Sequence, residues 1–144
     1  MNARTRTWLL SYAAAAAIFA AIDVVWILTV ANRQYESQIP HLMAPSVNAA
    51  GAVAFYLIFV AGIVHFGIRP NDPDATLRQR VTGAALYGFF TYATWALTAL
   101  AVLDGFPAVV AVTDIAWGVA VCSAVTWLTA TLLRRKLARA TAPA

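Results

Sequence analysis

Four long apolar stretches, separated by short polar segments, make up most of this sequence. They run near residues 8–30, 48–68, 81–101 and 109–133, and the charged side chains collect between them and at the two ends. Each stretch has about 20 residues or more, which is enough for an α-helix to cross a hydrocarbon core of about 30 Å. The pattern predicts a single all-α transmembrane domain, an integral membrane four-helix up-down bundle.

The first connection, residues 31–47, is the longest of the three. It contains two prolines, which exclude a continuous helix. We therefore expect a loop that starts directly after the first stretch and holds Tyr35 at the membrane interface, where aromatic side chains are common. Ser46 or Asn48 is placed to cap the second helix.

The second and third connections are short, so the second, third and fourth helices are expected to be antiparallel neighbours. Asp72 stands before a proline, which is typical of a helix N-cap. We expect the third helix to begin there and to carry Arg78 and Arg80 at the lipid headgroups. The third connection, "LDGFP", predicts a tight turn.

Small residues repeat at four-residue spacing in the first stretch, at Ala13, Ala17 and Ala21. Such a row lets another helix backbone approach closely inside a membrane.

The basic residues set the expected orientation. Every lysine and arginine except Arg33 falls on one side of the four-span arrangement, and basic loops mark the cytoplasmic side. We therefore expect the N and C termini to be cytoplasmic. Arg4 and Arg6 before an apolar run also resemble a secretory signal, but the run continues to Val30, well beyond a signal's usual core of about 7–15 residues. We expect the first helix to be retained.

Composition narrows the partners. The chain is 62% hydrophobic and only 11% charged, whereas soluble domains carry about 25% charged residues. The net charge of +4 is not arranged as a basic stripe between aromatics, so we expect the lipid bilayer, and no nucleic acid, as partner. The single cysteine, Cys122, excludes an internal disulfide and a cysteine-based metal site. The sequence indicates no metal and no cofactor.

Two aspartates interrupt the apolar pattern, each followed three residues later by a tryptophan. Asp23 precedes Trp26 in the first stretch, and Asp114 precedes Trp117 in the fourth. Residues three apart share one face of a helix. Because the two helices run in opposite directions, we expect both acids at a similar level, roughly 8–10 Å below the outer surface.

The middle two stretches are expected to supply the rest of a pocket that opens outward: Tyr56 from the second, and Trp95 and Thr98 from the third. No lysine or arginine lies inside the spans to neutralise the acids, and an ionised aspartate at the centre of a membrane helix costs about 2.5–3.5 kcal/mol. The pair is expected to hold a shared proton or a cationic ligand. The alternative is structural, with the acids bonding helices together.

Four segments of the chain resemble a known family. "AIDVVWI", "FYLIFVAGIVHFGIRP", "TYATWALTAL" and "DGFPAVVAVTDIAWG", in this order, are similar to domain of unknown function 2177, a family of small bacterial membrane proteins with four predicted helices. The resemblance covers nearly the whole chain. It implies this architecture and a multi-pass protein of the bacterial cytoplasmic (inner) membrane, and it implies no activity. The family's third helix usually reads tyrosine-aspartate-leucine-threonine-asparagine, so the acid and the amide of that motif are absent from Trp95–Ala99 here.

Three functions fit these features. We favour a small-ligand or proton/cation-binding protein with Asp23 and Asp114 as the site; transport would require a homodimer, because four helices enclose little volume. The second is a non-catalytic accessory or structural subunit of a larger membrane complex, which fits the short loops and the absent acid. The third is a membrane enzyme acting on a lipid or isoprenoid, with the two carboxylates as acid and base. No nucleophile motif supports an enzyme, and we assign no catalytic residue.

Overall fold

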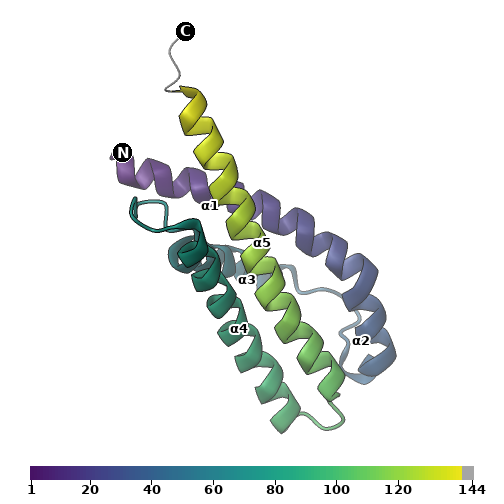
Figure 1. Ribbon diagram of the computed structural model, residues 1–144. Helices are drawn as coiled ribbons and strands as arrows, with labels where there is room; N and C mark the ends of the chain where they lie inside the picture. Colours follow the sequence, from purple (N-terminus) through teal and green to yellow (C-terminus); the bar gives the residue numbers. More distant parts are fainter. Residues whose placement is uncertain (141–144) are drawn as a thin grey trace.

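The computed structural model describes residues 1–140, with side chains as far as Leu133, and within that range the chain is helical without strands (Figure 1). Its elements are α1 (Ala3–Trp26), η1 (Ile27–Ala31), α2 (Asn32–Gln38), η2 (Pro40–Leu42), α3 (Ala49–Gly62), η3 (Ile63–Ile68), α4 (Leu77–Val102) and α5 (Ala108–Ala140). The segments η1 and η3 are π-helical, and η2 is a 3-10 turn.

Four helical rods in the described residues are long and apolar enough to cross a membrane, which confirms the predicted fold class. They cover Ala3–Gln38, Ala49–Ile68, Leu77–Val102 and Ala108–Leu133. The start of α1 and the described end of α5 lie at one end of the bundle, and α2 and the α4–α5 turn lie at the other (Figure 1). We call these the termini end and the turn end. Gly105 makes the turn by adopting a φ of 69°, which suits glycine.

The first rod is longer than predicted, and the expectation that a loop starts after residue 30 is wrong. The helix continues through η1 and α2 to Gln38 and ends only where Ile39 leaves the helical conformation, just before Pro40. Nothing in residues 31–38 forbids a helix, because the two prolines come later. Tyr35 is consequently helical and half-buried, and it does not lie in a loop.

Tyr35 reaches the inner face of this rod because of the π-helical segment η1. In a regular helix each residue turns the chain by about 100°, so the 12 positions from Asp23 to Tyr35 would leave the two side chains roughly 120° apart. A π segment holds about one extra residue, which takes roughly 100° off that difference. Both side chains can then face α5, and each makes a hydrogen bond with it.

The helix caps differ from the prediction at one of two places. Asn48 caps α3, as predicted, by accepting a hydrogen bond from the Gly51 amide at 3.0 Å. The third helix, in contrast, does not begin at Asp72. It begins at Leu77, because Thr76 and Gln79 form a reciprocal capping box that satisfies two amides which a helix start leaves open.

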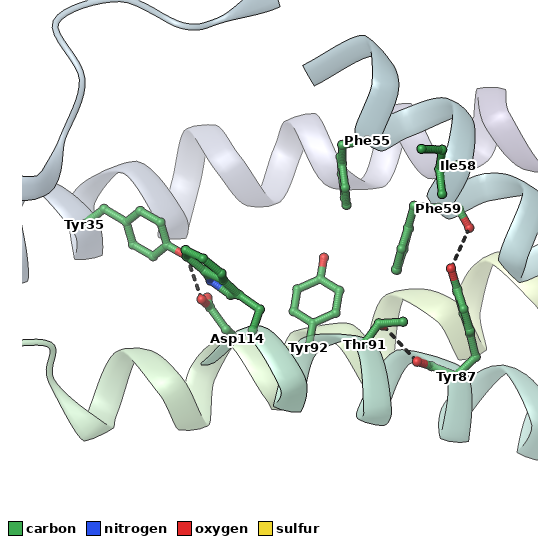
Figure 2. Close-up of a pocket in the computed structure, with 9 residues that line it drawn as sticks. Tyr35, Phe55, Ile58, Phe59, Tyr87, Thr91, Tyr92 and Asp114 are labelled. Carbon is green, nitrogen blue, oxygen red and sulfur yellow. Dashed lines mark hydrogen bonds between the residues drawn. The ribbon is translucent and has the colours of Figure 1, made fainter. Parts of the chain in front are cut away.

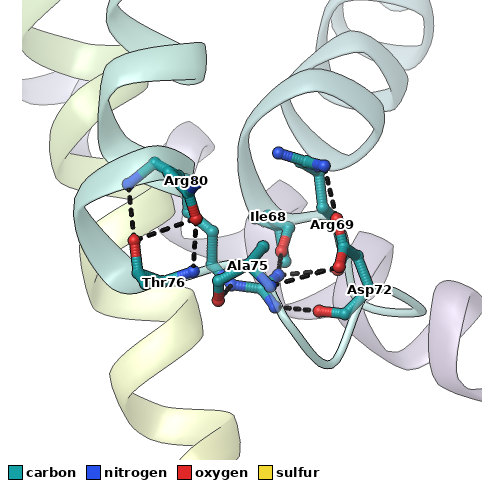
Figure 3. Close-up of polar contacts among 7 residues, drawn as sticks. Ile68, Arg69, Asp72, Ala75, Thr76 and Arg80 are labelled. Carbon is teal, nitrogen blue, oxygen red and sulfur yellow. Dashed lines mark hydrogen bonds and ion pairs between the residues drawn. The ribbon is translucent and has the colours of Figure 1, made fainter.

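Arg80 is buried, with 8% of its surface exposed, so the prediction that it lies at the headgroups is wrong. Its guanidinium donates to the main-chain carbonyl oxygens of Ile68, Arg69, Asp72 and Ala75 (Figure 3). A helix end leaves several carbonyls without partners, and η3 ends at Ile68. The arginine supplies the missing donors and holds the loop that connects η3 to α4.

The row of Ala13, Ala17 and Ala21, which permits close approach of another helix, is exposed in this structure. The buried face of α1 is the adjacent one, formed by Ser11, Ala15, Phe19 and Asp23. These residues also repeat every four positions, and they bring the larger Phe19 ring into the core. The core gains more buried apolar surface from this face than it would from three alanines.

Within the described residues, the most extensive helix contact joins α4 and α5, which lie side by side (Figure 1). It depends on Gly88 and Gly118: a β-carbon at Gly88 would lie 2.1 Å from the Gly118 carbonyl oxygen.

Two apolar clusters hold the bundle together. The larger is centred on α1, α3, η3 and α5, and the smaller packs Ile39, Ala96, Ala99, Phe106, Val110 and Ala111 together at the turn end. Tyr56 and Trp117 pack against the larger cluster, and Tyr35 packs against the smaller one.

Candidate functional site

Asp23 is almost fully buried, with 5% of its surface exposed, and both of its carboxylate oxygens accept a hydrogen bond. Tyr56 of α3 donates to Oδ2 at 2.6 Å, and the indole N–H of Trp117 of α5 donates to Oδ1 at 3.3 Å. One carboxylate of α1 therefore links three of the four rods. Hydrogen bonds to a charged acceptor are among the stronger ones in proteins, so this arrangement fixes the relative positions of the helices.

Two tryptophans cover Asp23 on the side of the turn end. The rings of Trp26 and Trp117 are stacked, with centroids 4.2 Å apart and planes only 4° from parallel. Trp26 follows Asp23 by one helical turn, and Trp117 donates a hydrogen bond to the Asp23 carboxylate. The stacked rings therefore lie next to this carboxylate. The tryptophans three residues after the two acids thus contact each other.

Asp114 is buried to a similar degree, with 6% of its surface exposed, but its carboxylate is only partly satisfied. Tyr35 of α2 donates to Oδ2 at 2.6 Å. Among the residues whose side chains are described, none donates a hydrogen bond to Oδ1, and no lysine or arginine forms an ion pair with either Asp114 or Asp23. The two acids differ in this respect: Asp23 has donors on both oxygens, and Asp114 has a donor on one.

Asp114 lies at one end of a cavity of about 540 Å³ (Figure 2). The cavity is lined by α2, α3, α4 and α5, through Tyr35, Phe55, Ile58, Phe59, Tyr87, Thr91, Tyr92, Trp95 and Asp114. Asp114 is the only charged member of this lining. The hydroxyl of Tyr92 points into the cavity (Figure 2), and the rings of Phe59 and Tyr92 meet edge to face at 5.8 Å. The site therefore combines one carboxylate with a mainly aromatic wall.

The structure divides the predicted pocket residues into two groups. Asp23, Tyr56, Trp26 and Trp117 are in mutual contact, and Asp114 and Trp95 line the cavity. Each acid has its own tyrosine donor, so they do not share a partner. Thr98 belongs to neither group, because its side chain is exposed and does not line the cavity.

Sequence reasoning missed the residue most important for Asp114, which is Tyr35. A helical continuation of the first stretch would have placed it opposite the fourth, and the unbroken run from Asn32 to Gln38 was the available signal. Tyr92 could have been found, because it precedes Trp95 by three positions and residues three apart share a face of a helix. Phe55 and Phe59 carry no signal of their own in a stretch that is apolar throughout.

The fold and the exposed apolar surface define a multi-pass integral membrane protein. The large apolar side chains of the spans are widely exposed on the outside of the bundle, for example Val25, Leu28, Ile58 and Val112, as expected where lipid is the solvent. The family described as "Predicted membrane protein (DUF2177)" matches residues 8–131, and the chain belongs to this family. The chain matches no curated protein and no solved structure.

Proposed function

We propose that this protein binds a small, positively charged ligand at Asp114, and that the carboxyl holds a proton when the ligand is absent. The observation that carries the proposal is the carboxylate oxygen of Asp114 that has no donor among the described residues, in an acid that lines a cavity. An unpaired charge in an apolar environment is costly. A proton or a bound cation removes that cost, and intramembrane acids commonly mark such sites.

In this proposal Asp23 is a positioning residue. Its two oxygens are occupied by Tyr56 and Trp117, so a ligand would have to displace an existing donor. Because Trp117 lies one turn from Asp114 on α5, the bond to Asp23 holds the segment that carries the ligand-binding acid. With the termini in the cytoplasm, as the basic residues predict, Asp114 lies about 9 Å from the outer start of α5.

The test is carboxyl modification by dicyclohexylcarbodiimide, which reacts with protonated carboxyls in apolar surroundings. We expect Asp114 to be modified at least tenfold faster than Asp23 when the labelled peptides are quantified by mass spectrometry. The exposed Asp104 is the control, because it lies outside the apolar surroundings that the reagent requires and is expected to stay unmodified. Equal rates at Asp23 and Asp114, or no reaction at Asp114, would contradict the proposal.

A matched binding measurement supports or rejects the same assignment. Native mass spectrometry of the detergent-extracted protein is expected to detect a bound non-protein mass in the wild type and not in Asp114→Asn. Asp104→Asn removes an equal charge near the turn end and should retain that mass.

The second candidate is a non-catalytic subunit of a larger membrane complex. The exposed row of Ala13, Ala17 and Ala21 favours it, because a face of small residues lets a helix of another protein approach closely. A protein companion in stoichiometric amount in the same mass spectra would support this role. A homogeneous monomer or homodimer would count against it.

A further inference from the structure

The cavity lies between α3 and α4 and opens at the side of the bundle. The two helices are joined mainly at the termini end, where α4 packs against η3, whereas α3 itself packs on α1 and η3. Beyond that point the rings of Phe59, Tyr87 and Tyr92 bridge the gap, with centroids 5.3 and 5.8 Å apart from Phe59. The remaining space is the cavity (Figure 2).

The rim of the cavity lies at the depth of the acyl chains. Ile58, Trp95 and Phe55 line the cavity and are nevertheless 72%, 58% and 42% exposed. Ile58 is about 14 Å along a rod, Ala49–Ile68, that is about 30 Å long, so it lies near the middle of the span. An opening at this depth, bordered by large apolar side chains, faces lipid and not water.

The chemistry of the lining decides which cation fits. Inorganic cations such as Ca²⁺ and Mg²⁺ take about six or more oxygen ligands, and here one carboxylate and a few hydroxyls stand among aromatic rings. Aromatic faces instead attract organic cations, by about 2 kcal/mol or more where water is excluded. The volume of 540 Å³ falls within the range of about 300–1,000 Å³ that is usual for sites of drug-sized molecules.

We infer that the ligand is a lipophilic organic cation, such as an amine with an apolar body, which enters from the bilayer between α3 and α4 and places its charge against Asp114. This rests on the proposed function and adds the ligand class and the route. The apolar body contacts the phenylalanines of α3 and Trp95, and the hydroxyl of Tyr92 accepts a hydrogen bond from a protonated amine. An anionic head finds no counter-charge in this lining, which contains no lysine or arginine.

The ligand class is tested with tetraphenylphosphonium, whose binding to the full-length protein in lipid nanodiscs is measured against empty discs. We expect saturable binding that weakens at least tenfold in Asp114→Asn and is retained in the charge control Asp104→Asn. Tetraphenylborate, an anion of the same shape, and tetramethylammonium, a cation without an apolar body, should bind at least tenfold more weakly. Preference for the borate, or equal binding to Asp114→Asn, overturns the inferred class.

A second variant keeps the test valid if Asp114→Asn does not fold. Ile58→Trp narrows the rim at an exposed position and should slow tetraphenylphosphonium association at least fivefold. Val53→Trp is the control, because Val53 is also exposed on α3, at 58% against 72% for Ile58, and lies outside the cavity. An unchanged rate in Ile58→Trp contradicts entry between α3 and α4.

The route is tested with a spin label on Ile58→Cys in a Cys122→Ala background, in lipid vesicles. The spin label should collide more often with oxygen, which concentrates in lipid, than with a water-soluble nickel chelate. Bound tetraphenylphosphonium should reduce the collisions of the label with both reagents. A larger nickel effect overturns the lipid route.

If tetraphenylphosphonium does not bind but native mass spectrometry still finds an Asp114-dependent ligand, the inferred class fails and the proposed function stands. If neither is found, both fail.

Discussion

Replacing Tyr56 by phenylalanine removes one hydroxyl and one hydrogen bond, the 2.6 Å bond to Asp23 Oδ2. The carboxylate, 5% exposed, then keeps only the longer bond from Trp117 at 3.3 Å. Hydrogen bonds to charged groups contribute about 1.5–3 kcal/mol in soluble proteins. Interhelical bonds in membranes average about 0.6 kcal/mol and reach about 1.7. A short bond to a buried carboxylate belongs at the upper end of the membrane range, so we expect a loss of about 1.5 kcal/mol, close to tenfold in the unfolding equilibrium.

The assay is equilibrium unfolding by sodium dodecyl sulfate in mixed micelles, followed by tryptophan fluorescence. Tyr12→Phe is the matched control, because Tyr12 also connects α1 with α3, but it donates to a neutral acceptor, the Leu57 carbonyl oxygen, at 3.0 Å. We expect Tyr12→Phe to cost no more than the membrane average of about 0.6 kcal/mol. In an Asp23→Asn background the acceptor is neutral, so Tyr56→Phe should cost about as little. Equal costs for Tyr56→Phe and Tyr12→Phe, or the same cost in both backgrounds, would refute the reasoning.

Three further predictions concern other parts of the fold. Gly88→Ala puts a β-carbon 2.1 Å from a backbone oxygen of α5, so it should lower stability by about 1–3 kcal/mol in the same unfolding assay. Deleting one residue of η1, Ile27–Ala31, restores a regular helix and turns Tyr35 away from Asp114 by about 100°. The deletion variant then lacks the Tyr35–Asp114 hydrogen bond, so carbodiimide should modify its Asp114 at the rate measured for Tyr35→Phe. Arg80→Gln leaves buried carbonyls without donors and should cost about 3 kcal/mol.

Matched substitutions separate these effects from general damage. Gly51→Ala places its β-carbon no closer than 3.7 Å to any neighbour, so it should be nearly neutral, and a similar loss there would contradict the close-packing argument for Gly88. Arg78 is exposed on the same helix turn as Arg80, and Arg78→Gln should leave the unfolding midpoint unchanged. If the deletion in η1 leaves the modification of Asp114 as in the wild type, the rotation attributed to the π segment is wrong.

The sequence was sufficient for the spans, because backbone groups in lipid must bond within helices and an apolar stretch of that length has few alternatives. It also identified both buried acids, since a carboxylate inside such a stretch is conspicuous. The geometry of Asp114 was not accessible, because it depends on a π segment whose residues, Ile27–Ala31, look like any apolar helix. The direction of each small-residue or aromatic face in a uniformly apolar rod is likewise set by tertiary packing and not by periodicity.

Arg80 illustrates the other limit. A basic residue near the end of a span is usually a headgroup ligand, and the position of Arg80 next to Arg78 gave no reason to expect otherwise. The carbonyl oxygens that require it belong to a loop whose path could not be predicted, because Arg69, the residue after η3, adopts a left-handed conformation (φ 46°). Thr98 lies outside the cavity because the rotation of α4 about its axis, which the sequence does not set, leaves this side chain exposed.

The rods differ greatly in length, and this has a mechanical consequence. The rod Ala3–Gln38 has 36 residues and Ala49–Ile68 has 20, so they measure about 54 and 30 Å. A bilayer that matches the short rod leaves the long one mismatched, and such helices respond by tilting. Because Tyr35 is near the far tip of the long rod, a change of tilt moves its hydroxyl relative to Asp114. The acyl-chain length of the bilayer therefore changes the strength of the hydrogen bond from Tyr35 to Asp114.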